Sequence, residues 1–381
     1  MKVAIIIRTC LQYDGRVLAQ IVTLANEYKS SAFTVYVYPN CKSENIKLPE
    51  NVIVIDSKLW TLKLPGSNTF LFIKQIHFGF SMLNKLIKSK PDIIHVHDEF
   101  PILGALIYKK FFNRKVNLVY DDHELYNLDA NPSLYRRLRK FLEFKMFSYA
   151  DQVNMANSHR AVYAKSVVKS LNDKEINVID NFPFTFFQSK IHKVETFKKE
   201  KGIKYLLHQG EINENRGKQL LVEVIKHLPE NWRIVLLGLP MDQFRQFVDQ
   251  YKDLAKRIVN GGRVPNDQII AVYGNFDASV VFYKTEMLNE KYCAPNRLYQ
   301  AANAGLPLIV NDNPALLDFI TINKTGIAID REIEEIVNNI NRFFRDYNIF
   351  FENARKLKGE FLYEEKVASK LIEVYQQIIN A

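Results

Sequence analysis

Two clusters of histidines and acidic residues follow predicted strands in the first half of the chain. The stretch PDIIHVHDEF places His95, His97 and Asp98 at the end of one apolar run. The stretch LVYDDHELY ends the next run with four further polar side chains, namely Asp121, Asp122, His123 and Glu124. Because ligands bind outside the carboxyl ends of strands in open parallel sheets, the clusters predict a site at this edge. One His on a strand is usually structural, but two such clusters in succession favour a site.

A His-x-His pair beside carboxylates is also typical of a metal site. Here the clusters follow separate strands, and no third set of ligands stands out. We therefore expect no metal.

A second candidate site lies in the stretch LLHQGEINENRGKQLLVEVI, where a strand, a charged loop and a helix follow one another. Arg216 falls close to the N-terminus of this helix. Its guanidinium, the free backbone N–H groups and the helix dipole can converge on one phosphate group. The alternative is a solvated loop charge.

The stretch CAPNRLYQAANAGLPLIV predicts a short, well-bounded helix followed by a strand. Pro295 suits the first helical turn, and Gly305 suits the position after the helix end. The small residues of the helix allow close packing against a sheet or a ligand. Gln300 is a lone amide in the middle of it.

The first predicted strand leads into RTCLQYDGRV, with a helix beginning near Arg16. Asp14 and Gly15 thus lie at a helix N-terminus, where free N–H groups favour an anion or a polar ligand. An ordinary turn with an Asp N-cap explains the same pattern.

Short apolar runs alternate with helical patterns along the chain, which indicates α/β units with a mostly parallel sheet. The predicted strands are 3–7, 33–38, 52–55, 93–96, 116–120, 152–156, 177–179, 205–208, 234–237, 257–259, 279–282 and 306–310. Residues 186–202 are polar and lysine-rich and interrupt this rhythm, as a linker would. Residues 364–379 predict one long amphipathic helix.

The composition of the 381 residues is that of an ordinary globular protein, with 47% hydrophobic and 25% charged residues. No apolar run is long enough to span a bilayer, and the N-terminus reaches a charge too early for a secretion signal. Cys10, Cys41 and Cys293 lie far apart and show no paired spacing typical of zinc sites or disulfides, so we expect reduced thiols. We find no Walker sequence, Gly-x-Gly-x-x-Gly motif or nucleophile elbow, so hydride transfer and hydrolysis have no support.

The net charge of +10 is concentrated in residues 1–185, which hold 25 basic and 17 acidic side chains. A basic half attracts nucleic acid, an anionic membrane or a phosphorylated substrate, and no nucleic-acid motif favours the first. Residues 70–90 and 136–147 are basic and interleaved with aromatic residues. They are either amphipathic helices with solvated charges or a membrane-facing surface.

In the motifs quoted above, the chain resembles the retaining nucleotide-sugar glycosyltransferases with the GT-B fold, specifically glycosyltransferase family 4. DGRVLAQIVTLANEY resembles the first loop and helix of the family, and DIIHVHD and YDDHELY its His-bearing strand ends. LLHQGEINENRG, WRIVLLG and APNRLYQAANAGLPLIV resemble its nucleotide-binding half. FLYEEKVASKLIEVY resembles the helix that crosses back to the first domain. The resemblance covers nearly the whole length.

The resemblance implies roles for matching residues. Arg216 matches the basic residue that holds the donor pyrophosphate, and His123 matches a histidine beside the transferred sugar and the acceptor; these two are the expected catalytic residues. The expected donor-binding residues are Gly15, Glu211, Arg216, Lys218, Asn289, Pro295, Asn296, Arg297 and Gln300. The expected acceptor-side residues are Asp14, His97, Asp98, Asp122 and Glu124.

Three positions near the expected donor site depart from the family pattern. Gln300 stands where many members have a ribose-binding Glu, and it lacks a charge-assisted hydrogen bond worth about 1.5–3 kcal/mol. Tyr292 stands at the other Glu position. Glu211 stands where many members have an Arg, so one basic phosphate ligand is replaced by an acid.

We therefore expect an α/β protein with two Rossmann-like doubly wound domains that face a cleft. The expected domains are 1–185 on the acceptor side, a linker at 186–203, a nucleotide-sugar domain at 204–358 and a crossover helix at 359–381, which packs on the first domain. Closure about the linker would exclude water from the cleft.

The expected activity is transfer of a sugar from a nucleotide diphosphate sugar to a hydroxyl of a glycan or lipid-linked acceptor, with retention. The expected pathway is bacterial surface polysaccharide or glycoconjugate synthesis, in the cytoplasm or peripherally on the inner face of an anionic plasma membrane. No cofactor or metal is expected to be required. Two alternatives are a GT-B scaffold that has lost catalysis and binds a partner or a glycan, and a sugar-nucleotide epimerase of similar fold.

Overall fold

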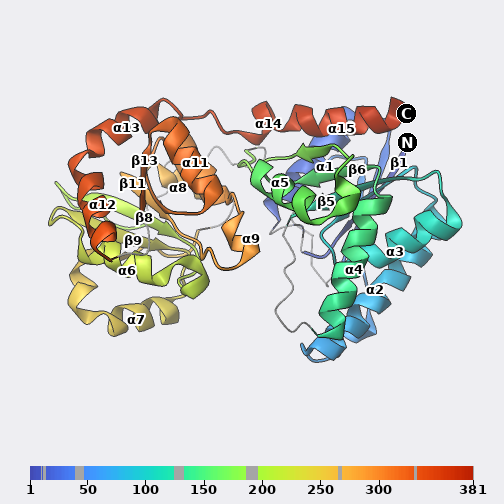
Figure 1. Cartoon of the computed structure of the whole chain (residues 1–381), viewed down its shortest axis with the longest axis horizontal. Coiled ribbons are helices and arrows are strands. Elements are labelled where there is room, and N and C mark those ends of the chain that lie inside the picture. The colour runs from blue at the N-terminus through green and yellow to red at the C-terminus, as the bar shows by residue number, and fades with distance from the viewer. Residues whose placement is uncertain are drawn as a thin grey trace. The chain divides into compact units, whose positions relative to one another are not determined.

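The computed structural model describes residues 1–9, 11, 14–38, 47–123, 133–185, 196–264, 268–329 and 333–380. The chain folds into two compact units. Unit 1 comprises Met1–Asp180 and Tyr363–Ala381, and unit 2 comprises Asn181–Leu362 (Figure 1). Cys10, Cys41, Glu124 and residues 186–195 of the expected linker lie outside the described residues.

The described part of unit 1 contains a seven-stranded sheet with the order β3-β2-β1-β4-β5-β6-β7. The strands are β1 (Lys2–Ile7), β2 (Ala32–Val37), β3 (Val52–Asp56), β4 (Ile93–His97), β5 (Asn117–Asp122), β6 (Gln152–Met155) and β7 (Ile176–Val178). Every pairing is parallel. Most strands carry buried apolar residues on both faces, because helices cover both sides of such a sheet.

The helices of unit 1 divide between the two faces of its sheet. One core joins alternate strand residues such as Ile94 and Leu118 to α2 (Asn68–Ser89), α3 (Ile102–Ile107), α4 (Leu134–Tyr149) and α5 (Ser158–Val167). The opposite face meets α1 (Gly15–Glu27) and the C-terminal helix α15 (Ala368–Asn380), whose side chains bond to β4 and β5. Short helical turns complete the unit at η2 (Trp60–Lys63), η3 (Tyr108–Phe112) and η4 (Lys169–Leu171).

The C-terminal segment forms two helices rather than the one long helix expected at 364–379. α14 (Tyr363–Lys366) ends at a turn at Val367, and α15 follows directly. The backbone N–H groups of Val367 and Leu371 still bond four residues back, so the interruption is slight. α15 packs against α1, where the rings of Tyr375 and Tyr28 lie 6.2 Å apart.

The described part of unit 2 contains a six-stranded parallel sheet with the order β10-β9-β8-β11-β12-β13. Its strands are β8 (Lys204–Gln209), β9 (Trp232–Leu237), β10 (Ile258–Asn260), β11 (Ala278–Val281), β12 (Leu308–Asn311) and β13 (Gly326–Ile329). The predicted strands all form within two residues of their expected bounds. β13 was not predicted; its sequence GIAI begins with a glycine and contains an alanine, residues that are depleted in strands.

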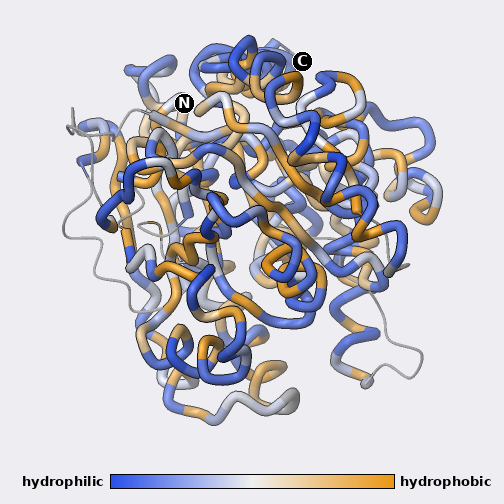
Figure 2. Tube along the Cα trace, turned by 90° about the vertical axis from the view of Figure 1, so that its left-hand side faces the viewer, coloured by the Kyte–Doolittle hydropathy of each residue, from blue (hydrophilic) through white to orange (hydrophobic). Residues whose placement is uncertain are grey.

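Among the described residues, each face of the sheet of unit 2 packs against helices through its own hydrophobic core. One face packs on α6 (Lys218–Lys226), α7 (Met241–Gln250) and α12 (Ile333–Arg345). The other packs on α8 (Ile269–Tyr273), α10 (Asn296–Asn303) and α11 (Pro314–Asn323). The remaining helices are η5 (Glu214–Arg216), η6 (Lys252–Arg257), α9 (Leu288–Lys291) and α13 (Tyr347–Arg355). Figure 2 shows hydrophobic and hydrophilic residues alternating along many of the helices, as expected where one side of each helix meets a sheet.

Within the described residues, no helix combines the length and the hydrophobicity needed to cross a membrane.

Candidate active site

The first candidate group lies at the carboxyl ends of β4 and β5 in unit 1. His95, His97 and Asp121 share one face of the sheet because side chains alternate along a strand. The rings of His95 and His97 stack with their centroids 4.3 Å apart, and both residues are at most 1% exposed. The topology therefore brings together the two polar clusters that the sequence places after successive strands.

Asp121 is the charged centre of this group. Its carboxylate accepts hydrogen bonds from the Arg16 guanidinium (2.5 Å) and the Gln20 amide (2.6 Å), both from α1. Burial alone would raise the pKa of Asp121, but the Arg16 guanidinium holds it below its usual value. Asp121 is thus ionised and paired. His95 is fixed from the other side by a 3.0 Å contact between Nδ1 and the Tyr375 hydroxyl of α15.

His123 follows β5 and lies against this group. Its Nε2 is 3.0 Å from Nδ1 of His97 and 3.4 Å from Asp121, and its backbone N–H donates to Asp98. Arg160 of α5 donates to its backbone carbonyl. Burial, followed by the Arg16 charge, lowers the pKa of His123 to about 4. His123 is therefore a neutral imidazole near pH 7, held on several sides.

The other expected acceptor-side residues are placed differently. Asp122 faces the opposite side of the sheet, where the Tyr120 hydroxyl donates to it, and burial and the Glu143 carboxyl raise its pKa. Asp98 has a positive φ of 63° and contacts His123. Asp14 is the N-cap of α1 and accepts from the N–H of Val17, which is the ordinary role that the sequence left open.

His95, His97 and Asp121 each offer a ligand atom, and these atoms lie within 4.8 Å of one another. Both Asp121 oxygens already accept hydrogen bonds, and the Arg16 charge at 2.5 Å would repel a metal cation. The geometry favours a hydrogen-bonded network over a metal centre.

The second candidate group lies at the carboxyl ends of β8 and β11 in unit 2. Arg216 ends the short turn η5, and Gly217 follows with φ of 67°. The side chain of Asn213 caps this turn by accepting from the N–H of Arg216. The Arg216 guanidinium lies 4.5 Å from the ring centroid of Tyr283. Among the described residues it forms no ion pair with a carboxylate.

Arg297, in the first turn of α10, lies against the other candidate residues and is 7% exposed. Its guanidinium donates to the carbonyls of Gln209 and Phe282 at the ends of β8 and β11. It also lies 4.5 Å from the Tyr283 ring centroid. Burial, followed by the Arg297 charge, lowers the pKa of His208 to about 3. This edge of the sheet therefore carries two guanidiniums beside a neutral histidine.

Gln300, on the next turn of α10, is 9% exposed and joins a buried polar network. Its side-chain oxygen accepts from the Tyr273 hydroxyl at 3.3 Å, and the same hydroxyl donates to Gln209. Gln300 thus connects α10 to α8 and β8, which is a structural reason for a lone amide in the middle of this helix.

The remaining expected donor residues lie on loops and helix ends, Gly15 in unit 1 and the others in unit 2. Glu211 is exposed and accepts from the Asn213 amide, whereas Lys218 donates to Gln250 of α7. Both line a groove of about 380 Å³ together with α7. Pro295 is the N-cap of α10 and Asn296 its exposed first residue. Asn289 lies in α9, and Gly15 is the exposed first residue of α1.

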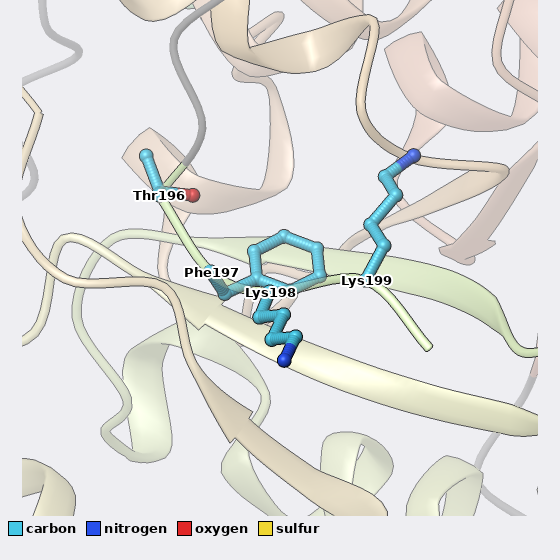
Figure 3. Close-up of a pocket in the computed structure, with 4 residues that line it drawn as sticks. All are labelled: Thr196, Phe197, Lys198 and Lys199. Atoms are coloured by element: carbon cyan, nitrogen blue, oxygen red, sulfur yellow. The ribbon is translucent and has the colours of Figure 1, made fainter. Parts of the chain in front are cut away.

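A larger cavity of about 450 Å³ is lined by Thr196, Phe197, Lys198 and Lys199. The Phe197 ring stacks near Phe276 and packs on Tyr205. In Figure 3 the ammonium groups of Lys198 and Lys199 point in different directions, so they do not converge on one anion. We therefore do not count this cavity as a further candidate site.

Two family descriptions match successive parts of the sequence. "Glycosyltransferase Family 4" matches residues 19–181, and "Glycosyl transferases group 1" matches residues 188–358. The chain belongs to the group 1 glycosyltransferases of family 4. It is thus a retaining glycosyltransferase that uses a nucleotide-sugar donor, as the sequence predicted.

Solved structures confirm the GT-B fold of this glycosyltransferase. Sucrose-phosphate synthase from Thermosynechococcus elongatus is 15% identical with a TM-score of 0.78, covering 100% of this chain and 99% of that one. The catalytic domain of starch synthase IV from Arabidopsis thaliana, bound to ADP and acarbose, is 14% identical with a TM-score of 0.73 and the same coverage. Anabaena HepE, in complex with UDP and glucose, is 14% identical with a TM-score of 0.68 and 100% coverage of both chains. No curated protein matches the glycosyltransferase in sequence.

The sequence did not single out three residues that organise these groups. The expected acceptor-side set contains Asp122 but not its neighbour Asp121, although strand alternation from His95 and His97 favours Asp121. In the sequence, Arg16 marks only the start of a helix. Tyr283 has no local signal, because its position between two arginines depends on residues distant in the sequence.

Proposed function

We propose that this glycosyltransferase transfers its sugar to a hydroxyl of a glycan or lipid-linked acceptor, in the synthesis of surface polysaccharide or glycoconjugate. We further propose that residues 186–203 link the acceptor-side domain 1–185 to the donor domain 204–358. The observation that carries the donor assignment is Arg216, a guanidinium held at a sheet edge without a carboxylate partner among the described residues. Such an edge suits a diphosphate.

The donor reaction requires stabilisation of a departing diphosphate and of an oxocarbenium-like sugar. Arg216 and the N–H groups at the start of α10 supply preorganised positive potential for the diphosphate. The leaving phosphate takes the proton of the acceptor hydroxyl. Because burial keeps His123 neutral, we assign it to positioning the sugar and the acceptor through hydrogen bonds rather than to charge stabilisation.

Purified Arg216→Ala and His123→Ala variants test these roles in a transfer assay. Loss of one preorganised donor to the leaving group typically lowers kcat about 10²–10³-fold. Arg342→Ala is the matched control, because Arg342 is a 60% exposed arginine of α12 in the same unit as Arg216. Near-normal transfer by both site variants would refute the assignment. A thermal-shift screen of nucleotide sugars identifies the donor beforehand, since a bound ligand raises the melting temperature.

The acceptor proposal rests on the outward side of α4. Leu134, Phe141 and Phe144 are 84%, 53% and 37% exposed, and Arg137 and Lys145 lie exposed among them. We call these five residues the α4 stripe. Large apolar side chains beside basic ones favour binding to an anionic membrane surface, with the rings in the headgroup region. A membrane contact on unit 1 is consistent with a lipid-linked acceptor.

Liposome sedimentation tests the α4 stripe. We expect the wild type to bind vesicles with phosphatidylglycerol, less so at high salt, and to bind neutral vesicles weakly. The variant Phe141→Ser/Phe144→Ser should lose most of this binding. The control Ile322→Ser/Ile349→Ser removes two apolar side chains of unit 2 that are even more exposed, at 76% and 64%, and should keep this binding. Equal binding by both variants, or binding that does not respond to salt, would contradict the proposal.

A further inference from the structure

Tyr283 lies directly after β11, at the point where the candidate donor residues meet. Its ring is 9% exposed, and the guanidinium carbons of Arg216 and Arg297 each lie 4.5 Å from the ring centroid. A cation at this distance from an aromatic face is attracted by the ring quadrupole, most strongly where water is excluded. One ring therefore contacts two positive charges that would otherwise repel each other.

The backbone of Tyr283 is fixed independently of these arginines. The buried Asn311 at the end of β12 accepts from the Tyr283 N–H at 2.9 Å and donates to its carbonyl at 2.8 Å. A side-chain amide that satisfies both backbone groups of one residue holds that residue in a single orientation. The ring is thus placed by the sheet rather than by the loop that carries Arg216.

The Arg216 loop also meets this strand end closely. The Lys284 N–H donates to the Asn215 carbonyl at 2.9 Å. A Cβ on Gly217 would lie 2.6 Å from the Phe282 Cβ, so only glycine allows this approach. These contacts place the loop backbone, but the long side chain of Arg216 makes no hydrogen bond of its own among the described residues. Its aromatic contact is with Tyr283.

Arg297 differs from Arg216 in being anchored. Its two hydrogen bonds to strand-end carbonyls fix the guanidinium, whereas the contact of Arg216 with Tyr283 leaves its N–H groups available to a ligand. Neither guanidinium pairs with a carboxylate within the described part of the chain. Two like charges on one ring, without an acid to balance them, are matched by a dianion.

We propose that Tyr283 is a positioning residue for donor binding, which presents the Arg216 guanidinium to the donor diphosphate through its aromatic face. This inference rests on the proposed role of Arg216. The ring restricts the rotamers of Arg216 before the ligand arrives, so less conformational entropy is lost on binding. Its hydroxyl is not needed for this role, which separates Tyr283 from a catalytic residue.

The test is a double-mutant cycle on nucleoside diphosphate binding, measured by calorimetry with the nucleotide found in the thermal-shift screen. We expect Tyr283→Leu to weaken binding about tenfold, and Tyr283→Phe, which keeps the ring, to restore it. In the Arg216→Ala background, Tyr283→Leu should have almost no further effect. Transfer kinetics should show the loss in KM for the donor, with a smaller change in kcat.

Tyr347→Leu is the matched control. Tyr347 is 7% exposed in the same unit, and its ring also carries a cation, with the Lys204 ammonium 3.9 Å from the ring centroid. Its loss should lower stability without changing nucleotide affinity. Fully additive effects of Tyr283→Leu and Arg216→Ala, or weak binding by Tyr283→Phe, would overturn the inference. If the wild type bound no nucleoside diphosphate, or Arg216→Ala bound normally, the proposed function itself would fail instead.

Discussion

Buried neutral histidines should make each unit of this glycosyltransferase sensitive to acid. Burial lowers the pKa of His95 to about 4, from 6.5 in the unfolded chain. The unfolded state therefore binds a proton as the pH falls below 6.5, whereas the folded state does not until about pH 4. The contribution of neutral His95 to the stability of unit 1 is therefore fully present above pH 6.5, and it declines as the pH falls from 6.5 to about 4.

The size of this effect follows from the interval between the unfolded pKa and the working pH. From 6.5 down to pH 5 is 1.5 units, which corresponds to about 2 kcal/mol for His95. Burial also lowers the pKa of His123 to about 4, so its contribution has the same sign and declines over the same pH interval. The His95 contribution alone is a sizeable part of the about 5–15 kcal/mol by which a domain is typically stable.

His95→Asn isolates one of these contributions. The Asn amide can replace Nδ1 as the partner of the Tyr375 hydroxyl, but it does not titrate. The variant is expected to be less stable at pH 7.5 because of its smaller volume. Its stability should nevertheless fall by about 2 kcal/mol less than the wild type's between pH 7.5 and pH 5.

Urea unfolding followed by tryptophan fluorescence measures this difference unit by unit. Of the two tryptophans, Trp60 belongs to unit 1 and Trp232 to unit 2. In a Trp232→Phe background, Trp60 reports on unit 1, and in a Trp60→Phe background Trp232 reports on unit 2. His95→Asn should alter only the pH dependence read by Trp60. His208→Gln, in unit 2, is the reciprocal control. If the pH dependence of unit 1 were unchanged in His95→Asn, protonation of His95 would not cause the loss of stability in acid.

Three further predictions concern single groups. Arg16→Met should lower the free energy of unfolding of unit 1, measured in urea, by about 3–5 kcal/mol, because it leaves the Asp121 carboxylate buried without a charged partner. The double variant Arg16→Met/Asp121→Leu should lower it less than the single change. Asp122→Asn should gain stability relative to the wild type as the pH rises from 4 to 7, because a raised carboxyl pKa contributes stability only at low pH; a constant difference across this range would contradict the assignment. Gln300→Glu should tighten nucleoside diphosphate binding in calorimetry by about tenfold if this position contacts the ribose, and unchanged affinity would place the ribose elsewhere.

The strands and their carboxyl-end polar residues could be predicted from the sequence because continuous Val and Ile runs have few alternative structures. The clusters at His95–His97 and at Asp121–His123 were correctly assigned to neighbouring strand ends for the same reason. The contacts among them could not be predicted. Asp121 and Asp122 are adjacent in sequence, yet strand alternation turns one toward Arg16 and the other toward Tyr120.

The organisation around Arg216 depended even more on tertiary structure. The sequence alone predicts that Arg216 lies close to the N-terminus of a helix. Its neighbours Tyr283, Arg297 and Asn311 come from separate segments that meet only when β8, β11 and β12 pair. Gln300 shows the same limitation. Its contact with Tyr273 links residues 27 positions apart, and no local pattern encodes that contact.

Whether Arg216 binds the donor diphosphate is measured by calorimetry, which compares a nucleoside diphosphate with its nucleoside on wild type and Arg216→Ala. If Arg216 binds the diphosphate, the wild type should prefer the diphosphate strongly, and Arg216→Ala should lose about 10–100-fold of that preference while binding the nucleoside as before. Arg342→Ala should behave as the wild type. An Arg216→Ala variant that kept the full preference would show that Arg216 does not bind the diphosphate.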